Sequence, residues 1–158
     1  MGMLCNCMSD MLIALNIPTY YYLIAIGLGV VTGVWRKRWI DGVLASYLFI
    51  VFTATILNRK LGVITGFTPE LFWSWKRPDL RAQIYANIFM LIPVGLLLGY
   101  KIGWKSIPEA AMISAFIEVV QLITKRGLFE FDDIIHNTLG AVIGFWICSL
   151  LRRAKHDI

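Results

Sequence analysis

EVVQLITKRGLFEFDDIIHNTLGAVIG, residues 118–144, is the stretch of the chain that decides the fold. Its two ends are apolar and are typical of membrane helices, while its centre carries carboxylates, an arginine, amides and glycines. Hydrocarbon offers no water to an ionisable side chain, so each such group needs a partner and by default marks a functional site. The junction is therefore the first candidate for the functional site, although the pattern leaves its chemistry open.

The composition predicts an integral membrane protein. Of the 158 residues, 58% are hydrophobic and 16% are charged, against about 45–50% apolar and about 25% charged residues in typical soluble domains. The net charge of +5 comes from short basic clusters at the ends of apolar runs, where anionic lipid headgroups attract them. We therefore expect membrane lipids as partners, and no nucleic acid.

The length leaves room for a single domain, residues 1–158, with many passes through the cell membrane. The three cysteines, Cys5, Cys7 and Cys148, have neither the spacing of a metal site nor that of a disulfide framework, so the sequence predicts no metal and no cofactor. No basic segment precedes the first apolar run, as a signal peptide would require, and we expect this run to be retained as a helix.

The apolar runs predict an all-α, polytopic fold, because each is long enough to cross about 30 Å of hydrocarbon. We expect a bundle of about five transmembrane helices, with Pro93 kinking the third helix and Gly95 and Gly99 offering a close-packing face. Between the second and third helices, residues 61–83 mix aromatic with charged side chains, which is typical of an interfacial segment. Residues 1–16 fit either an interfacial or a disordered segment. The five predicted spans cover residues 17–35, 39–57, 84–100, 107–123 and 134–151.

Basic residues predict the orientation, because Lys and Arg in short loops are retained on the cytoplasmic side. Five spans place the first loop, the third loop and the C-terminus on one side of the membrane. The tight basic clusters at residues 36–38 and 152–155 lie on that side. We therefore expect the N-terminus outside and the C-terminus in the cytoplasm.

Alternation of the spans brings the unusual polar residues together on the outer side, in a shallow pocket open to the outer leaflet. At 1.5 Å per residue, Glu118 and Asn137 reach a similar depth, while Gly140 and Gly144 would let a neighbouring helix approach closely. The candidates for catalysis are Glu118, Asp132 and Asp133, and the candidates for substrate binding are Arg59, Arg81, Asn87, Gln121, Arg126 and Asn137.

Each candidate also has a structural interpretation. Asp132 or Asp133 could cap the fifth helix, and Glu118 could simply pair with Arg126 or Arg59, since a buried acid needs a cation. Gln121 and Asn137 could form hydrogen bonds between helices. Arg59 and Arg126 could contact lipid phosphate. His136 could occupy a passive interfacial position.

The junction resembles the VanZ-like family of small bacterial membrane proteins. The resemblance extends from about Asn87 to Gly144, and Asn87 with Pro93-x-Gly95 is similar to one family signature. Glu130 stands where the family often has Asp, and the family's Asn-Leu-Ile-Pro-Phe type of segment is poorly matched around residues 66–75. The most specific parts of the resemblance are Glu118-x2-Gln121 and the run that contains Arg126-Gly127, Asp132-Asp133 and Asn137-Thr138-Leu139-Gly140.

This resemblance implies a bacterial cell-envelope protein from a family named for low-level resistance to teicoplanin, a lipoglycopeptide antibiotic. We expect the pocket to bind or modify a lipid-linked or other envelope substrate, or to bind the lipoglycopeptide itself. One alternative is an enzyme in which Glu118 or Asp133 acts as acid or base on an envelope lipid or glycan, with Arg126 or Arg59 stabilising negative charge. Another is a small transporter, which ranks last because the spans show no clear inverted repeat. The oligomeric state is left open.

Overall fold

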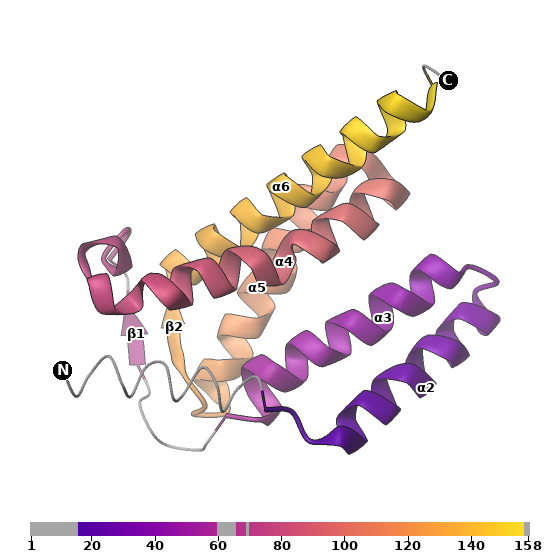
Figure 1. Cartoon of the computed structure of the whole chain (residues 1–158). Coiled ribbons are helices and arrows are strands. Elements are labelled where there is room, and N and C mark those ends of the chain that lie inside the picture. The colour runs from indigo at the N-terminus through magenta and orange to yellow at the C-terminus, as the bar shows by residue number, and fades with distance from the viewer. Residues whose placement is uncertain (1–15, 60–65, 69, 157–158) are drawn as a thin grey trace.

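Five α-helices make up most of the computed structural model, which describes residues 16–59, 66–68 and 70–156 (Figure 1). They match the five predicted spans closely, and the predicted all-α membrane fold is confirmed. The undecided segment at residues 1–16 lies outside the described residues, apart from Asn16. The helices are α2 (Thr19–Trp35), α3 (Trp39–Phe52), α4 (Arg81–Ile102), α5 (Ser106–Ile123) and α6 (Phe131–His156).

Three continuous helical stretches of the described chain are long and apolar enough to cross a membrane. They are Trp39–Leu57, Pro78–Ile123, which contains both α4 and α5, and Phe131–Lys155. The 17-residue α2 is a shorter apolar helix, about 25 Å long at 1.5 Å per residue. Large apolar side chains are exposed along it, among them Leu23 and Val31, which is the surface expected of a helix that faces lipid.

Helices α4 and α6 run parallel to each other and form the tightest packing in the fold. A Cβ atom on Gly140 would overlap the carbonyl oxygen of Ile88, and one on Gly144 would overlap that of Ile92. Small residues allow this approach because no side chain separates the two backbones. The predicted packing roles of Gly140 and Gly144 are confirmed. Helix α4 continues through Pro93 without interruption.

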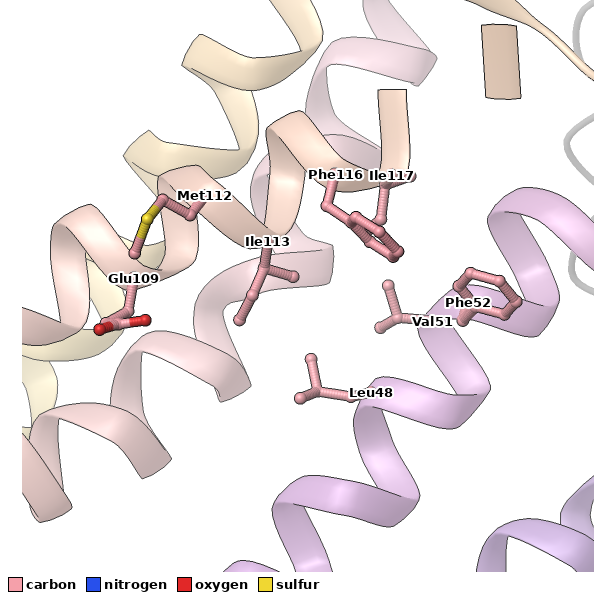
Figure 2. Close-up of a pocket in the computed structure, with 8 residues that line it drawn as sticks. All are labelled: Leu48, Val51, Phe52, Glu109, Met112, Ile113, Phe116 and Ile117. Atoms are coloured by element: carbon pink, nitrogen blue, oxygen red, sulfur yellow. The ribbon is translucent and has the colours of Figure 1, made fainter. Parts of the chain in front are cut away.

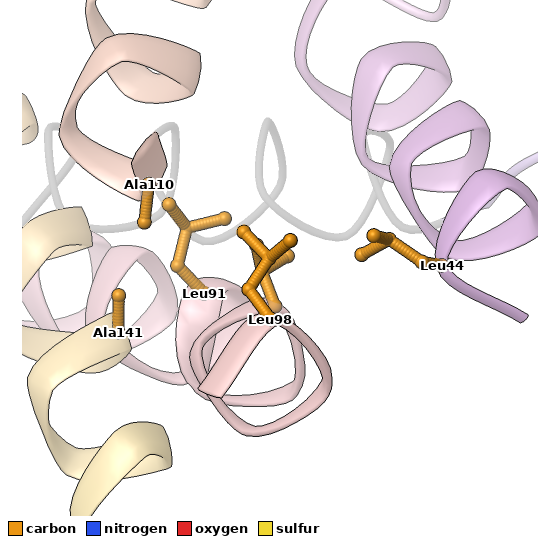
Figure 3. Packing of buried hydrophobic residues seen from close by; sticks show 6 residues of the cluster. Leu44, Leu91, Leu98, Ala110 and Ala141 are labelled. Atoms are coloured by element: carbon orange, nitrogen blue, oxygen red, sulfur yellow. The ribbon is translucent and has the colours of Figure 1, made fainter. Parts of the chain in front are cut away.

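The apolar core lies where α4 meets α3, α5 and α6. Leu91 and Val94 of α4 are fully buried there, together with Ala110 of α5 and Ala141 of α6 (Figure 3). Leu44 extends from α3 toward the same cluster. Because this core joins every helix except α2, it fixes the ends of α4, α5 and α6 relative to one another.

Helices α2 and α3 form a hairpin that lies beside the other three (Figure 1). Gly29 and Gly42 bring the two helices into backbone contact, and the hydroxyl of Ser46 donates to the carbonyl of Ala25 at 2.7 Å. The last turn of α3 continues as a π-helical turn, η1 (Thr53–Leu57). This turn delivers the backbone carbonyls that the candidate site uses.

The predicted interfacial segment folds as short pieces against the start of α6. Strand β1 (Gly66–Thr68) pairs in parallel with β2 (Leu128–Glu130), with Phe67 opposite Phe129. Phe67 stacks on Phe129 and meets the edge of Phe131, and both Phe67 and Phe131 remain exposed. Exposed aromatic side chains at the end of a helical bundle fit a membrane surface. The remaining turns are η2 (Ser74–Lys76), η3 (Pro78–Leu80) and η4 (Gly103–Lys105).

Candidate functional site

Asp132, in the first turn of α6, ties the interfacial segment to the bundle. Its buried carboxylate accepts hydrogen bonds from the backbone N–H of Phe72 at 2.5 Å and of Ser74 at 3.0 Å, and from the Ser74 hydroxyl at 2.5 Å. Hydrogen bonds to a charged acceptor are among the stronger ones in proteins. The interpretation of Asp132 as a helix cap is therefore wrong, because its partners belong to residues 72–74.

His136 lies one turn further along the same face of α6. The indole N–H of Trp75 donates to its Nε2 at 2.7 Å, so Nε2 carries no proton and the neutral ring has its proton on Nδ1. His136 is 1% exposed, and the expectation of a passive interfacial residue is wrong in this respect. Within the described chain, Nδ1 has no hydrogen-bond partner although it is buried.

Three buried carboxylates come together at the junction of α5, β2 and α6. Glu118, Glu130 and Asp133, here called the carboxylate cluster, are 2%, 6% and 8% exposed. Glu118 Oε2 accepts the backbone N–H of Glu130 at 3.1 Å. Each acid interacts electrostatically with Arg59 and with at least one other acid of the cluster.

Arg59 is the cation that partly balances this cluster. Among the described residues, however, no basic nitrogen lies within 4.0 Å of a carboxylate oxygen of Glu118, Glu130 or Asp133. The expected Glu118–Arg59 pair therefore exists as attraction at longer range. One cation cannot neutralise three acids, so the cluster either retains protons or carries an excess of negative charge.

Glu130 shows the effect of this crowding outside the membrane-spanning segments. Burial, reinforced by the nearby Asp133 carboxylate, raises the pKa of Glu130 to about 7, while Arg59 acts in the opposite direction. Its carboxyl group is therefore divided between the protonated and ionised forms near neutral pH. A carboxyl group of this kind can donate or accept a proton. It can also release its proton and accept a hydrogen bond from a ligand instead.

Amide side chains from α4 and α6 surround the cluster. The Gln83 amide donates to Asp133 at 3.4 Å, and the side chain of Asn87 also faces Asp133. Asn137 donates from Nδ2 to the hydroxyl of Ser114 on α5 at 2.8 Å. Asn137 therefore joins two helices, as one alternative predicted, but its buried Oδ1 has no partner in the described chain. An unpartnered buried oxygen is costly, so Asn137 Oδ1 is available to accept a hydrogen bond from a ligand.

Gln121 and Arg126 bind the backbone at the end of α3. The Gln121 amide donates to the carbonyl of Thr55 at 3.2 Å. The Arg126 guanidinium donates from Nη1 to the carbonyl oxygens of Ile56, Leu57 and Arg59, at 2.9, 2.7 and 3.0 Å. The expected Glu118–Arg126 pair is therefore wrong, because Arg126 satisfies the carbonyls of η1 instead. Gln121 and Arg126 therefore hold the backbone at the end of α3, and Arg126 also binds the carbonyl of Arg59.

Most of the residues predicted for the pocket do meet at one end of the bundle. Arg81 is the exception: it begins α4 with an exposed side chain, and no hydrogen bond or ion pair is recorded for it among the described residues. Sequence reasoning does not select Glu130, which it notes only as standing where the resembled family often has Asp. The parallel pairing of β1 with β2 buries it, and two three-residue strands have no clear sequence signal. Ser114 was also missed, although it lies four residues before Glu118.

A family model described as VanZ/LLP1 matches residues 42–152. The chain belongs to the VanZ/LLP1 family. The matched part of this VanZ/LLP1 protein begins in α3 and ends in α6, so it contains the carboxylate cluster and all of its described neighbours. Neither a curated protein nor a solved structure gives a significant match.

The chemistry available to the VanZ/LLP1 site comes from oxygen and amide groups. Among the described residues, no group of three or more His, Cys, Asp or Glu side chains has an arrangement that could hold a metal ion. The carboxylate cluster accepts hydrogen bonds or protons, and Asn137 Oδ1 adds a further acceptor. His136 Nδ1 adds a donor nearby on α6. The site therefore suits a ligand rich in hydroxyl or amino groups.

Proposed function

We propose that this VanZ/LLP1 protein is a cell-envelope protein that binds the polar headgroup of a lipid-linked or other envelope substrate through its carboxylate cluster. The observation that supports this most directly is the burial of three acids for which Arg59 is the one nearby cation among the described residues. Such an arrangement costs free energy unless protons or a ligand offset it. Hydroxyl and amino groups of a glycan or peptide headgroup supply donors of this kind.

The position of the cluster supports a ligand that is held in the membrane. Glu118 lies in the last turns of α5 and Asp133 in the first turns of α6, so a headgroup at the surface reaches them while its lipid remains in the bilayer. Exposed aromatic side chains, among them Phe67 and Trp75, lie around the same end. The same acceptors fit the sugars and amines of a lipoglycopeptide, which connects the site to the resistance for which the resembled family is named.

Charge-neutral substitutions test the binding proposal. Glu118→Gln and Asp133→Asn remove charge with little change in shape, and Glu70→Gln is a matched control because Glu70 is exposed in the interfacial segment. Mass spectrometry of lipids that co-purify with the protein should show an envelope species retained by the wild type and the control. Loss of about tenfold in affinity, or roughly 1.4 kcal/mol, is expected for each cluster variant. Unchanged retention at equal protein abundance would refute the proposal.

The second candidate function is acid–base catalysis on an envelope lipid or glycan. It is favoured by Glu130, whose pKa of about 7 lies near the value that suits a general acid or base at neutral pH. Enzyme and binder differ in turnover, so lipid extracts from cells with and without the protein are compared. A converted species that disappears in the Glu118→Gln and Asp133→Asn strains supports catalysis. An unchanged lipid profile together with specific retention supports binding alone.

We propose that the end of the bundle with the carboxylate cluster faces the outside of the cell, and the orientation of the protein in the membrane tests this. Cysteine substitution of exposed Glu70 places a probe at the end with the carboxylate cluster, and substitution of Lys105 places one at the opposite end. Cys5 and Cys7 are replaced by Ser, and buried Cys148 is retained. A reagent that does not cross membranes should label position 70 in intact cells but not position 105. The opposite result would reverse the orientation.

A further inference from the structure

A second cluster of charges lies at the opposite end of the bundle, around Asp41 in the first turn of α3. Asp41 is 6% exposed, and its Oδ1 lies 2.5 Å from the Nζ of Lys101 on α4. Its Oδ2 lies 3.5 Å from the Nε of Arg36 and 4.0 Å from that of Arg38. One carboxylate therefore meets three cations, and this cluster has an excess of two positive charges.

The excess charge borders an open cavity of about 260 Å³ between the α2–α3 hairpin and the end of α4. Arg36, Asp41 and Lys101 line one part of it, and Leu44 and Leu48 of α3 line another. Arg36 has five N–H donors in all, and its side chain is 57% exposed. An anion in this cavity would therefore meet charged donors on one side and hydrocarbon on the other.

An apolar groove of about 350 Å³ continues from this cavity along α3. Leu48 lines both spaces, and Val51 and Phe52 carry the groove further along α3, opposite Ile113 and Phe116 of α5 (Figure 2). The two helices run in the same direction, so the groove extends from the basic end toward the middle of the bundle. The charged cavity and the apolar groove adjoin at Leu48, so together they offer a space with a charged part and an apolar part.

We propose that this space binds an anionic phospholipid, with its phosphate against Arg36 and Lys101 and one acyl chain in the groove past Leu48. The charge excess selects an anionic over a zwitterionic headgroup, and the groove requires an acyl chain that a free phosphate lacks. Glu109, in the first turn of α5, lines the groove at this same end of the bundle (Figure 2) but does not line the cavity, so the phosphate lies in the cavity beside Arg36 and Lys101, away from the Glu109 carboxylate.

This site is separate from the carboxylate cluster. The cluster lies at the end of α5 and the start of α6, whereas the lipid site lies at the end of α2, the start of α3 and the end of α4. Arg36, Arg38 and Asp41 also precede the residues matched by the family model. The inference therefore holds or fails independently of the proposed headgroup pocket.

The test uses the full chain in detergent, exposed to equal amounts of phosphatidylglycerol and phosphatidylcholine with the same acyl chains. Native mass spectrometry should show preferential retention of phosphatidylglycerol by the wild type. Retention should fall about tenfold in Arg36→Gln, which removes an exposed cation, and in Leu48→Trp, which fills the passage between cavity and groove. Lys105→Gln is the matched control, because Lys105 is an exposed cation of the same end that does not line the cavity.

Lys101→Gln leaves Asp41 without its closest cation, so the double variant Lys101→Gln/Asp41→Asn is measured in its place. This variant removes one positive and one negative charge together, and we expect weaker phosphatidylglycerol retention from the loss of the Lys101 ammonium. Equal retention of the two lipids by the wild type would overturn the proposal. Competition by inorganic phosphate at the same concentration as the lipid would also overturn it, since that result would describe a phosphate site without a chain-binding groove.

Discussion

The two ends of the bundle carry opposite arrangements of the same chemical groups. At one end, the carboxylate cluster of Glu118, Glu130 and Asp133 shares Arg59, the one cation near it in the part of the chain that the structure describes. At the other end, the single acid Asp41 is surrounded by three cations at 4.0 Å or less. The buried cluster at one end therefore has more acids than cations, and the cluster at the other end has more cations than acids, among the described residues.

This difference shows that helix packing and charge balance are separate features of the fold. The glycine contacts between α4 and α6 hold the bundle together along its length, so neither end has to be neutral for the helices to associate. Packing of small residues is the main source of helix association where no hydrophobic effect separates helix from lipid. Each end is therefore free to keep an excess of charge for a ligand of the opposite kind.

The largest expected effect comes from disrupting the packing of α4 against α6, which connects the two ends of the bundle. Gly140→Val would place side-chain atoms against the backbone of Ile88, and overlap with backbone cannot be relieved by a rotamer change. We expect a loss of about 3 kcal/mol or more, seen as loss of monodisperse protein after extraction. Gly27→Val is the control, because no atom lies within 4 Å of a Cβ at that position. Equal yields for both variants would disprove the tight α4–α6 contact.

Two adjacent acids, Asp132 and Asp133, are expected to differ in role: Asp132 stabilises the fold, and Asp133 belongs to the carboxylate cluster. Asp132→Ala removes the acceptor for residues 72–74, and we expect at least about 2 kcal/mol of destabilisation, since even one hydrogen bond to a charged group contributes about 1.5–3 kcal/mol. Asp133→Asn relieves repulsion within the carboxylate cluster, so its thermal stability should equal or exceed that of the wild type while headgroup retention falls. Thermal unfolding in detergent measures the first effect. A stability loss of equal size in both variants would assign Asp133 a structural role.

The sequence predicted the helices well, because long apolar runs ended by basic clusters leave few alternatives. It also predicted that Glu118 and Asp133 would lie close together, since the alternation of spans fixes their end of the bundle and helical spacing fixes their face. The packing of Gly140 and Gly144 followed from the same spacing. These features depend on periodicity within single helices, which can be read from the chain directly.

The partners of the polar residues could not be predicted in the same way. One alternative paired Glu118 with Arg126 or Arg59, but Arg126 binds the carbonyls at the end of η1 instead, where helix carbonyls have no partner within the helix. Glu130 became part of the cluster through the pairing of two very short strands. Both outcomes depend on backbone geometry between distant segments, for which neither residue spacing nor composition provides a signal.

The next prediction alters the basic end and is smaller in effect. Asp41→Asn removes the one acid that pairs with Arg36, Arg38 and Lys101 among the described residues, so the excess charge of this cluster rises from two to three. We expect the variant to retain phosphatidylglycerol about threefold more strongly, while its thermal stability falls because the three cations repel one another. Native mass spectrometry with the lipid mixture described above measures the first change. Unchanged or weaker retention would show that these cations do not face a lipid headgroup.

The smallest expected effect is a pH dependence at the acidic end. The pKa of Glu130 is raised from about 4.5 to about 7 in the folded protein, so between these values the folded chain holds a proton that the unfolded chain releases. Stability should therefore fall as the pH rises through this window. Glu130→Gln cannot titrate, and its unfolding temperature should decline less from pH 4.5 to 8 than that of the wild type. Parallel curves would mean that Glu130 is not crowded by the carboxylate cluster, and the charge contrast between the two ends would then rest on Glu118 and Asp133 alone.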